Sequence, residues 1–269
     1  MSTATPALTL DTASTPGIPF SRLVGVEFRK SYDTRAGFWL LAVMGILVAV
    51  AEVIAVLVCL LNDIDSITFG TFATVAGVIT GLLLPVLGIM LVTTEWTQRS
   101  AMVTFTLESR RTRVILAKLL VGLLLTLATI VFVVVVGAIC NAVFVAFGGE
   151  TTWVDSEFVQ GIVGFALSQA LAMILGFAFA ALFLNTAAAI VIYFAYSFVL
   201  PTLFAIGSVT MDWFDKLADW IDFNAAQQPL FEIVDMTGKE WAQLLVSGAI
   251  WLGIPLVIGL RRILRAEVK

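Results

Sequence analysis

The chain has 269 residues, of which 60% are hydrophobic and only 13% are charged, and its mean hydropathy is +1.05. Soluble domains carry about 25% charged residues, so this composition excludes an ordinary soluble domain and predicts an integral membrane protein. The absence of histidine excludes Ser-His-Asp hydrolases and HExxH zinc proteases. Two cysteines are too few for a structural zinc site, and a net charge of −4 argues against a nucleic-acid partner.

The amino-terminal segment divides into a tail and a helix. Residues 1–17 are rich in Ser, Thr, Ala and Pro, which predicts a disordered cytoplasmic tail, and residues 18–269 are predicted to form one transmembrane domain. Between Pro19 and Ala36 the pattern is weakly amphipathic. We expect a helix there that lies in the membrane interface. The alternative is a plain positively charged lead-in to the first span.

Six apolar runs are long enough to cross a bilayer, which requires about 20 residues of helix. The predicted fold class is therefore an all-α integral membrane protein with six transmembrane helices. A single helix through the fourth and fifth runs would be too long for a bilayer, so they are read as two spans. The six predicted spans are Phe38–Leu61, Thr71–Thr94, Lys118–Phe147, Val159–Leu184, Ala187–Val209 and Ala242–Leu260.

The distribution of Lys and Arg predicts the orientation. Thirteen of the 15 basic residues fall in the amino-terminal segment, in the loop after the second span or in the carboxyl tail, and only Lys216 and Lys239 fall on the other side. Basic loops stay on the cytoplasmic side of a membrane. Both termini are therefore predicted to be cytoplasmic, in a multi-pass protein of a bacterial cytoplasmic membrane.

A stripe of small residues stands out in the fourth predicted span. Gly164, Ser168, Ala172, Gly176 and Ala180 recur at every fourth position of the fourth span. Such a stripe allows close helix packing, either inside this bundle or in a dimer.

Glu52 is the one acidic residue inside the predicted spans, in the outer half of the first. Intramembrane carboxylates are candidate functional residues, so Glu52 is a candidate for the substrate path. The alternatives are a protonated or hydrogen-bonded side chain without such a role.

The loop Glu95–Lys118 has the pattern of a short helix flanked by charge. Met102, Phe105 and Thr106 share a helical face and Leu107 lies beside them. A short apolar helix on a cytoplasmic loop is suited to docking into a groove of a soluble partner. The alternative is an interfacial helix that contacts only lipid.

This loop resembles permease subunits of type-2 ABC exporters. The shared features are a glutamate that ends the second span (Glu95), a short helix, a basic SRRTRVILAK segment, and an opening segment VEFRKSYDTRAGFWLL. The sequence departs from the family pattern at Ser100-Ala101 and at Ser109. The resemblance implies two ATPase subunits and a second permease copy or a similar permease as partners. It also implies ATPase-coupling roles for Glu95, Met102, Phe105, Leu107 and Glu108.

A second amphipathic segment precedes the last span. From Asp212 to Asn224 the aspartates occupy one helical face, and aromatic and aliphatic residues, among them Trp213, Leu217 and Trp220, occupy another. This predicts an outer amphipathic helix at the membrane–water interface. In the family that the chain resembles, such helices cover the translocation route; the alternative is an aromatic membrane anchor.

The chain has no ATP-binding motif of its own. Its only Gly-Lys pair is Gly238-Lys239, which is followed by Glu240 instead of Ser or Thr, so no P-loop is present. We therefore expect a non-enzymatic permease subunit that binds no cofactor, with ATP and Mg²⁺ on the partner ATPase. A secondary transporter or channel that uses Glu52 is the alternative; a membrane-embedded enzyme would need more polar residues within the spans.

Overall fold

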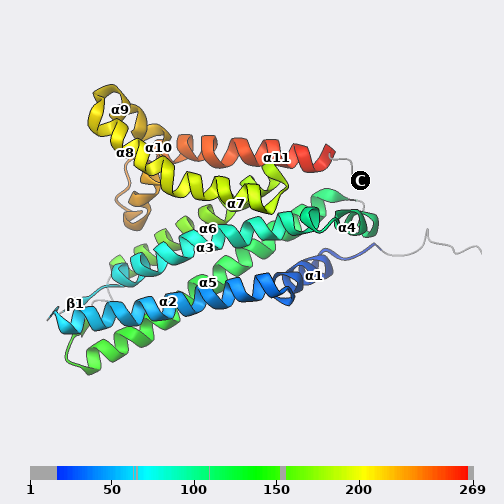
Figure 1. The fold of residues 1–269 in the computed structure, drawn as a ribbon. Coiled ribbons are helices and arrows are strands. Elements are labelled where there is room, and N and C mark those ends of the chain that lie inside the picture. The colour runs from blue at the N-terminus through cyan, green and yellow to red at the C-terminus, as the bar shows by residue number, and fades with distance from the viewer. Residues whose placement is uncertain (1–16, 63, 65, 109, 152–155, 266–269) are drawn as a thin grey trace, which may run out of the picture.

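The computed structural model describes residues 17–62, 64, 66–108, 110–151 and 156–265, and the chain is almost entirely helical over them (Figure 1). Of the predicted amino-terminal tail, residues 1–16 lie outside the described residues. The first half of the chain forms α1 (Phe20–Asp33), α2 (Arg35–Leu61), β1 (Ser66–Ile67), α3 (Phe69–Thr97), α4 (Ala101–Leu107), α5 (Arg111–Ala146) and β2 (Glu150–Thr151). The second half forms α6 (Ser156–Phe183), α7 (Thr186–Phe194), η1 (Ala195–Val199), α8 (Leu200–Thr210), α9 (Asp212–Ile221), η2 (Ala225–Glu232), α10 (Gly238–Gly248), η3 (Ala249–Gly253) and α11 (Ile254–Arg265).

Six helical segments are long and apolar enough to cross a membrane, in agreement with the six runs read from the sequence. They are Arg35–Leu61, Phe69–Thr97, Arg111–Ala146, Phe158–Phe183, Thr186–Thr210 and Gly238–Arg265. The fifth consists of α7, η1 and α8, and the sixth of α10, η3 and α11. Six such helices indicate a multi-pass membrane protein.

The boundaries differ from the sequence prediction where a helix continues past its apolar part. The third span begins at Arg111 instead of Lys118, because α5 extends two turns beyond the apolar run. The break between the fourth and fifth spans is as expected. Leu184 has a φ of 52°, a left-handed conformation that ends α6, and the Asn185 side chain accepts a hydrogen bond from the Ala188 amide at 3.0 Å. The two helices are therefore separated by a capped turn.

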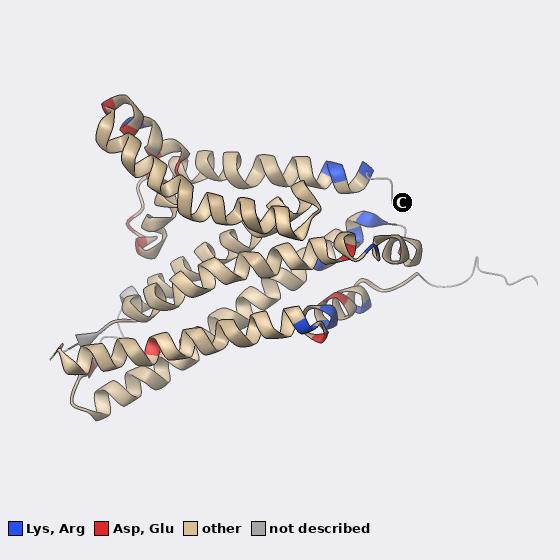
Figure 2. Ribbon diagram, viewed as in Figure 1, with Lys and Arg blue, Asp and Glu red and all other residues tan. Residues whose placement is uncertain are grey.

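The charges divide between the two ends of the bundle. Figure 1 shows α1, α4 and the last turn of α11 at one end, and β1 and α9 at the other. Lys and Arg gather at the first end, which we call the basic end (Figure 2). The opposite end, called the acidic end, holds α9 and the parallel pair β1–β2, in which Ser66 pairs with Glu150.

Helix α6 lies at the centre and packs against α3, α5, α7, η2 and α11. Its small residues let other backbones approach closely. A Cβ atom at Gly176 would overlap the carbonyl oxygen of Pro85 in α3, and one at Gly164 would overlap the carbonyl oxygen of Leu230 in η2. At these two positions, the stripe of small residues serves packing within the chain, which is the first of the two alternatives, packing inside the bundle or in a dimer.

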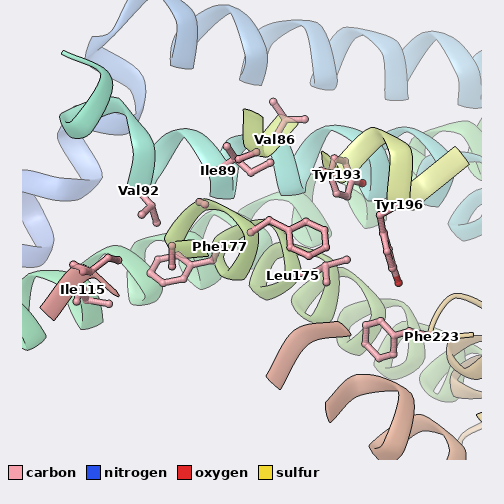
Figure 3. Close-up of a cluster of buried hydrophobic side chains, with 14 of the residues drawn as sticks. Val86, Ile89, Val92, Ile115, Leu175, Phe177, Tyr193, Tyr196 and Phe223 are labelled. Carbon is pink, nitrogen blue, oxygen red and sulfur yellow. The ribbon is translucent and has the colours of Figure 1, made fainter. Parts of the chain in front are cut away.

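The largest hydrophobic cluster joins α3, α6, α7, η1 and α11 (Figure 3). In it, Tyr193 donates a hydrogen bond to the Gly81 carbonyl oxygen at 2.6 Å, while Tyr196 packs on Trp251 with ring centroids 5.1 Å apart. Tyr196 and Trp251 lie in η1 and η3, which are π-helical segments of the fifth and sixth spans. A π-helical segment adds one residue to a helical turn and is frequent at functional sites.

Candidate functional site

Four charged side chains meet inside the basic end, and we call them the charge cluster: Glu27, Lys30, Glu95 and Lys118. Helix α1 supplies Glu27 and Lys30, the last turn of α3 supplies Glu95, and the third turn of α5 supplies Lys118. All but Lys30 are buried, with residue exposures of 1% for Glu27, 6% for Glu95 and 5% for Lys118. The cluster therefore joins α1 to two helices, α3 and α5, that lie far from it in the sequence.

The sequence of α1 explains how Glu27 reaches the interior. Leu23, Glu27 and Ser31 are spaced by four residues, form one stripe of the helix and are its buried residues. Leu23 packs against Val114 and Ala117 at the start of α5. The stripe that faces the protein is therefore partly polar.

The apolar side chains Phe20 and Phe28 of α1 point away from the rest of the protein: Phe20 is 37% exposed and Phe28 is 38% exposed. An amphipathic helix in the membrane interface presents its apolar side chains to lipid in this way.

The two lysines bridge the two glutamates. Lys118 Nζ lies 2.5 Å from one Glu27 carboxylate oxygen and 3.3 Å from Glu95, and Lys30 Nζ lies 2.7 Å from the other Glu27 oxygen and 2.8 Å from Glu95. Lys118 also donates to the Leu91 carbonyl oxygen at 3.0 Å. Two positive and two negative charges leave the cluster formally neutral, which is the condition under which charges are tolerated in a protein interior.

The electrostatics of Lys30 follow from these pairs. Burial by itself lowers the pKa of Lys30, but the hydrogen bonds and negative charges of Glu27 and Glu95 outweigh it, so the pKa is raised above its ordinary value. Lys30 therefore remains protonated at neutral pH.

The charge cluster also holds the short helix α4. Thr104 of α4 donates a hydrogen bond to the Glu95 carboxylate at 2.9 Å, and the Ser100 amide donates to the Glu95 carbonyl oxygen at 2.9 Å. Arg99, just before Ser100, adopts a φ of 57°, which turns the chain sharply after α3. Glu95, expected from the sequence to be part of the site, is thus one of the residues that connect α4 to the spans.

Met102 and Phe105 of α4 differ in their burial. Met102 is 48% exposed and points away from the bundle. Phe105, expected on the same face as Met102, is half-buried: its ring lies 6.2 Å from that of Trp96, and the Arg111 guanidinium lies 5.0 Å above it. Phe105 therefore fastens α4 to the bundle, and the exposed apolar surface of α4 is formed by other side chains, Met102 among them.

Glu108 ends the same segment and organises the start of α5. Its carboxylate accepts a hydrogen bond from the Arg110 amide at 3.1 Å and forms an ion pair with Arg113 at 2.7 Å. Arg113 also donates to the Ile18 carbonyl oxygen at 2.7 Å, just before α1. The predicted site residue Glu108 thus has a positioning role within the chain. Ser109, which follows Glu108, lies outside the described residues.

Glu52 lies apart from this site, in α2. Its exposure is 0%, and neither carboxylate oxygen has a hydrogen-bond partner among the described residues. Val48 and Val56 lie one turn before and after it in the same buried stripe. The sequence located Glu52 within a span, but its isolation in an apolar environment is visible only in the structure.

The predicted outer residues lie on α9 at the acidic end. Trp213 is 64% exposed and Leu217 is 42% exposed, whereas Trp220 is half-buried. The helix folds back on α8 through Phe214, whose ring lies 5.9 Å from that of Phe204. Residues Asp212–Ile221 therefore form a helix with apolar side chains on its free surface, and its place at the outer membrane–water interface stays a prediction.

Three members of the charge cluster were not identified from the sequence as site residues: Glu27, Lys30 and Lys118. A charged residue in the buried stripe of α1 and a lysine at the start of an apolar run are the two signals available. Neither signal indicates a partner, since Glu27 and Lys118 are 91 positions apart.

Comparison with known proteins adds no relative. No protein-family model matches the chain, and no curated protein matches it at a significant level. The function is therefore inferred from the residues and geometry of the chain itself.

Proposed function

We propose that the chain is the transmembrane subunit of an ATP-driven exporter of the type-2 ABC class. In this proposal it lies in a bacterial cytoplasmic membrane with the basic end and both termini in the cytoplasm. The concentration of Lys and Arg at the basic end supports that orientation (Figure 2). Two copies, or this chain and a similar permease, would enclose the substrate path.

The observation that carries the proposal is the construction of α4. This seven-residue helix lies at the basic end, presents Met102 outward, and is joined to the spans by Phe105 and by the Thr104–Glu95 hydrogen bond. A short helix with an exposed apolar side chain and a firm connection to the bundle is suited to receive force from a soluble partner. It is the coupling helix of the proposed exporter.

The charge cluster gives that helix a route to the spans. A displacement of α4 would act on Glu95 through Thr104, and from Glu95 on α1 and α5 through Lys30 and Lys118. In the proposed mechanism, ATP-driven closure of the ATPases moves α4, and the connected helices move with it between inward-open and outward-open states. The network supplies the contiguous contacts that such coupling requires.

The remaining parts follow from the same assignment. The chain has no P-loop, so ATP and Mg²⁺ would bind to two separate ATPase subunits. Helix α9, with Trp213, Leu217 and Trp220, would lie at the outer surface of the membrane and cover the exit of the substrate path. No nucleic acid and no cofactor on this chain are part of the proposal.

Substitution of Met102 tests the docking of an ATPase. Met102→Asp places a carboxylate where an apolar side chain would be buried in the partner, which costs several kcal/mol in an apolar groove. We expect the wild-type chain, purified in mild detergent, to carry a P-loop ATPase with vanadate-sensitive ATP hydrolysis. The Met102→Asp variant should lose most of both.

Met211→Asp is the matched control, since Met211 is 42% exposed at the acidic end and caps the start of α9, where Asp is favourable. It should retain the ATPase. The proposal fails if the wild-type chain binds no P-loop protein, or if Met102→Asp retains as much ATPase as Met211→Asp.

The enclosure of Glu52 favours a second candidate function, secondary transport driven by protons. An ionised carboxylate buried without a partner is costly, so Glu52 is stable there as the neutral acid and could release its proton only when water reaches it. This candidate predicts proton movement in vesicles that contain the chain alone, and the loss of that movement in Glu52→Gln. Proton flux that is equal in both, or absent from both, contradicts it.

A further inference from the structure

A cavity lies at the basic end, beside the charge cluster, in the described part of the chain. It has a volume of about 660 Å³ and is enclosed by α1, the last turns of α3, and α4. Cavities of this size accommodate small ligands. Because α3 ends and α2 begins at this level, the cavity lies where the apolar spans meet the membrane surface.

The walls of the cavity are apolar on two sides. Leu23 and Val26 line it from α1, and Val103 and Leu107 line it from α4. Val103 is 60% exposed and Leu107 is 71% exposed, so these side chains are left uncovered by the chain itself. Met102 does not line the cavity. Helix α4 therefore presents one apolar surface to the cavity and a different one to the proposed ATPase.

The charges that line the cavity leave one cation without a partner. All three carboxylates, those of Glu27, Glu95 and Glu108, form ion pairs with Lys30, Lys118 or Arg113. Arg22 also lines the cavity, and it forms no ion pair or side-chain hydrogen bond with any residue that the structure describes. The site thus offers apolar walls and one uncompensated guanidinium, which binds phosphate well.

We propose that this cavity binds an anionic phospholipid of the membrane, with the lipid phosphate on Arg22 and part of an acyl chain along Val26, Val103 and Leu107. Charge complementarity and the position of the cavity at the ends of the spans both favour this occupant. The exposed Phe20 and Phe28 beside it on α1 are surfaces that a bilayer covers. The proposal requires only that the chain lies in a membrane and does not depend on the exporter assignment.

The lipid would act on the same elements that carry the coupling. It would contact α1 and α4 together, and these two helices also meet through Glu95 of the charge cluster. Occupancy by lipid would hold α4 against α1, because the two sets of apolar side chains would then be buried on a common ligand. Anionic lipid content of the membrane would therefore set how firmly α4 is held.

Retention of lipid by the purified full-length chain tests the proposal. The chain is solubilised in detergent with equal amounts of phosphatidylglycerol and phosphatidylcholine of the same acyl chains, and bound lipid is counted by native mass spectrometry. We expect one phosphatidylglycerol to be retained per chain in preference to phosphatidylcholine. Arg22→Gln should weaken this retention about tenfold, since it removes a charge-assisted contact to the phosphate.

Arg29→Gln is the matched control on the same helix. Arg29 is exposed, pairs with Asp33 at 3.0 Å and does not line the cavity, so its removal should change retention by no more than about twofold. Val26→Trp provides a variant that keeps every charge but fills the cavity, and it should displace the lipid as Arg22→Gln does. Thermal unfolding of each variant in lipid-free detergent shows whether the fold is retained.

Four results would overturn the proposal. Equal losses in Arg22→Gln and Arg29→Gln would mean that lipid responds only to the general charge of α1. Equal retention of the two lipids would remove the role of the phosphate charge. Displacement of phosphatidylglycerol by glycerol phosphate would mean that the cavity binds a soluble anion without the acyl chain. Full retention in Val26→Trp would place the lipid elsewhere.

Discussion

Replacement of Lys118 by Met tests whether the charge cluster stabilises the basic end. The ammonium group lies within 3.3 Å of the carboxylates of Glu27 and Glu95, and the side chains of all three residues are at most 8% exposed. Met has a similar length but no charge, so two buried carboxylates would share the single charge of Lys30. Removing one partner of a buried ion pair costs roughly 3–5 kcal/mol. We expect about 3 kcal/mol here, because Lys30 remains.

Thermal unfolding in detergent, followed by tryptophan fluorescence, measures the effect. For a chain of this size, 1 kcal/mol corresponds to about 2–4 °C in Tm, so Lys118→Met should lower Tm by roughly 6–12 °C. The matched control is Lys239→Met. Lys239 pairs with Asp219 at 3.5 Å with both side chains more than half exposed, and such pairs contribute less than about 1 kcal/mol.

A double-mutant cycle identifies the partner. In a Glu27→Gln background, Lys118→Met should be less destabilising than in the wild type, because the carboxylate that it leaves unpaired is already absent. If Lys118→Met lowers Tm no more than Lys239→Met, the buried ion pairs do not stabilise this end. Additive effects of the Glu27 and Lys118 substitutions would also contradict the reasoning.

Three further predictions concern other parts of the chain. In a background without the native cysteines, a membrane-impermeant thiol reagent added outside should label a cysteine at Asp219 but not one at Gln98; labelling of both, or of Gln98 alone, contradicts the proposed orientation. Gly176→Leu should lower stability by about 3 kcal/mol, measured as Tm, since its side chain would force α3 and α6 apart. Tyr193→Phe should cost about 1 kcal/mol, because it removes a hydrogen bond, whereas Tyr196→Phe should be neutral or stabilising, because the Tyr196 hydroxyl is buried without a partner among the described residues. Equal losses of Tm in the two Phe variants would contradict this last comparison.

The six spans and the gathering of basic residues at one end could be predicted from the sequence. Both depend on local quantities: a run of apolar residues long enough for a bilayer, and the sign of the charges that flank it. The turn between the fourth and fifth spans was also readable, since Asn185 and Thr186 interrupt an apolar run that no single helix could carry across a membrane. The start of the third span was not, because α5 continues through charged residues that pair with other helices.

The contacts between polar groups of different helices could not be predicted from the sequence. The sequence indicated Glu52 within the first span and Glu95 at the end of the second as candidate site residues, but it did not indicate their partners. Glu95 has two lysine partners, and Glu52 has no hydrogen-bond partner among the described residues. The same holds for α4, where Phe105 turns inward onto Trp96 and Met102 does not. Apolar burial depends mainly on the amount of surface removed from water, which composition and periodicity reveal. Ion pairs and hydrogen bonds depend on distances between side chains of different helices, which are set only when the helices pack.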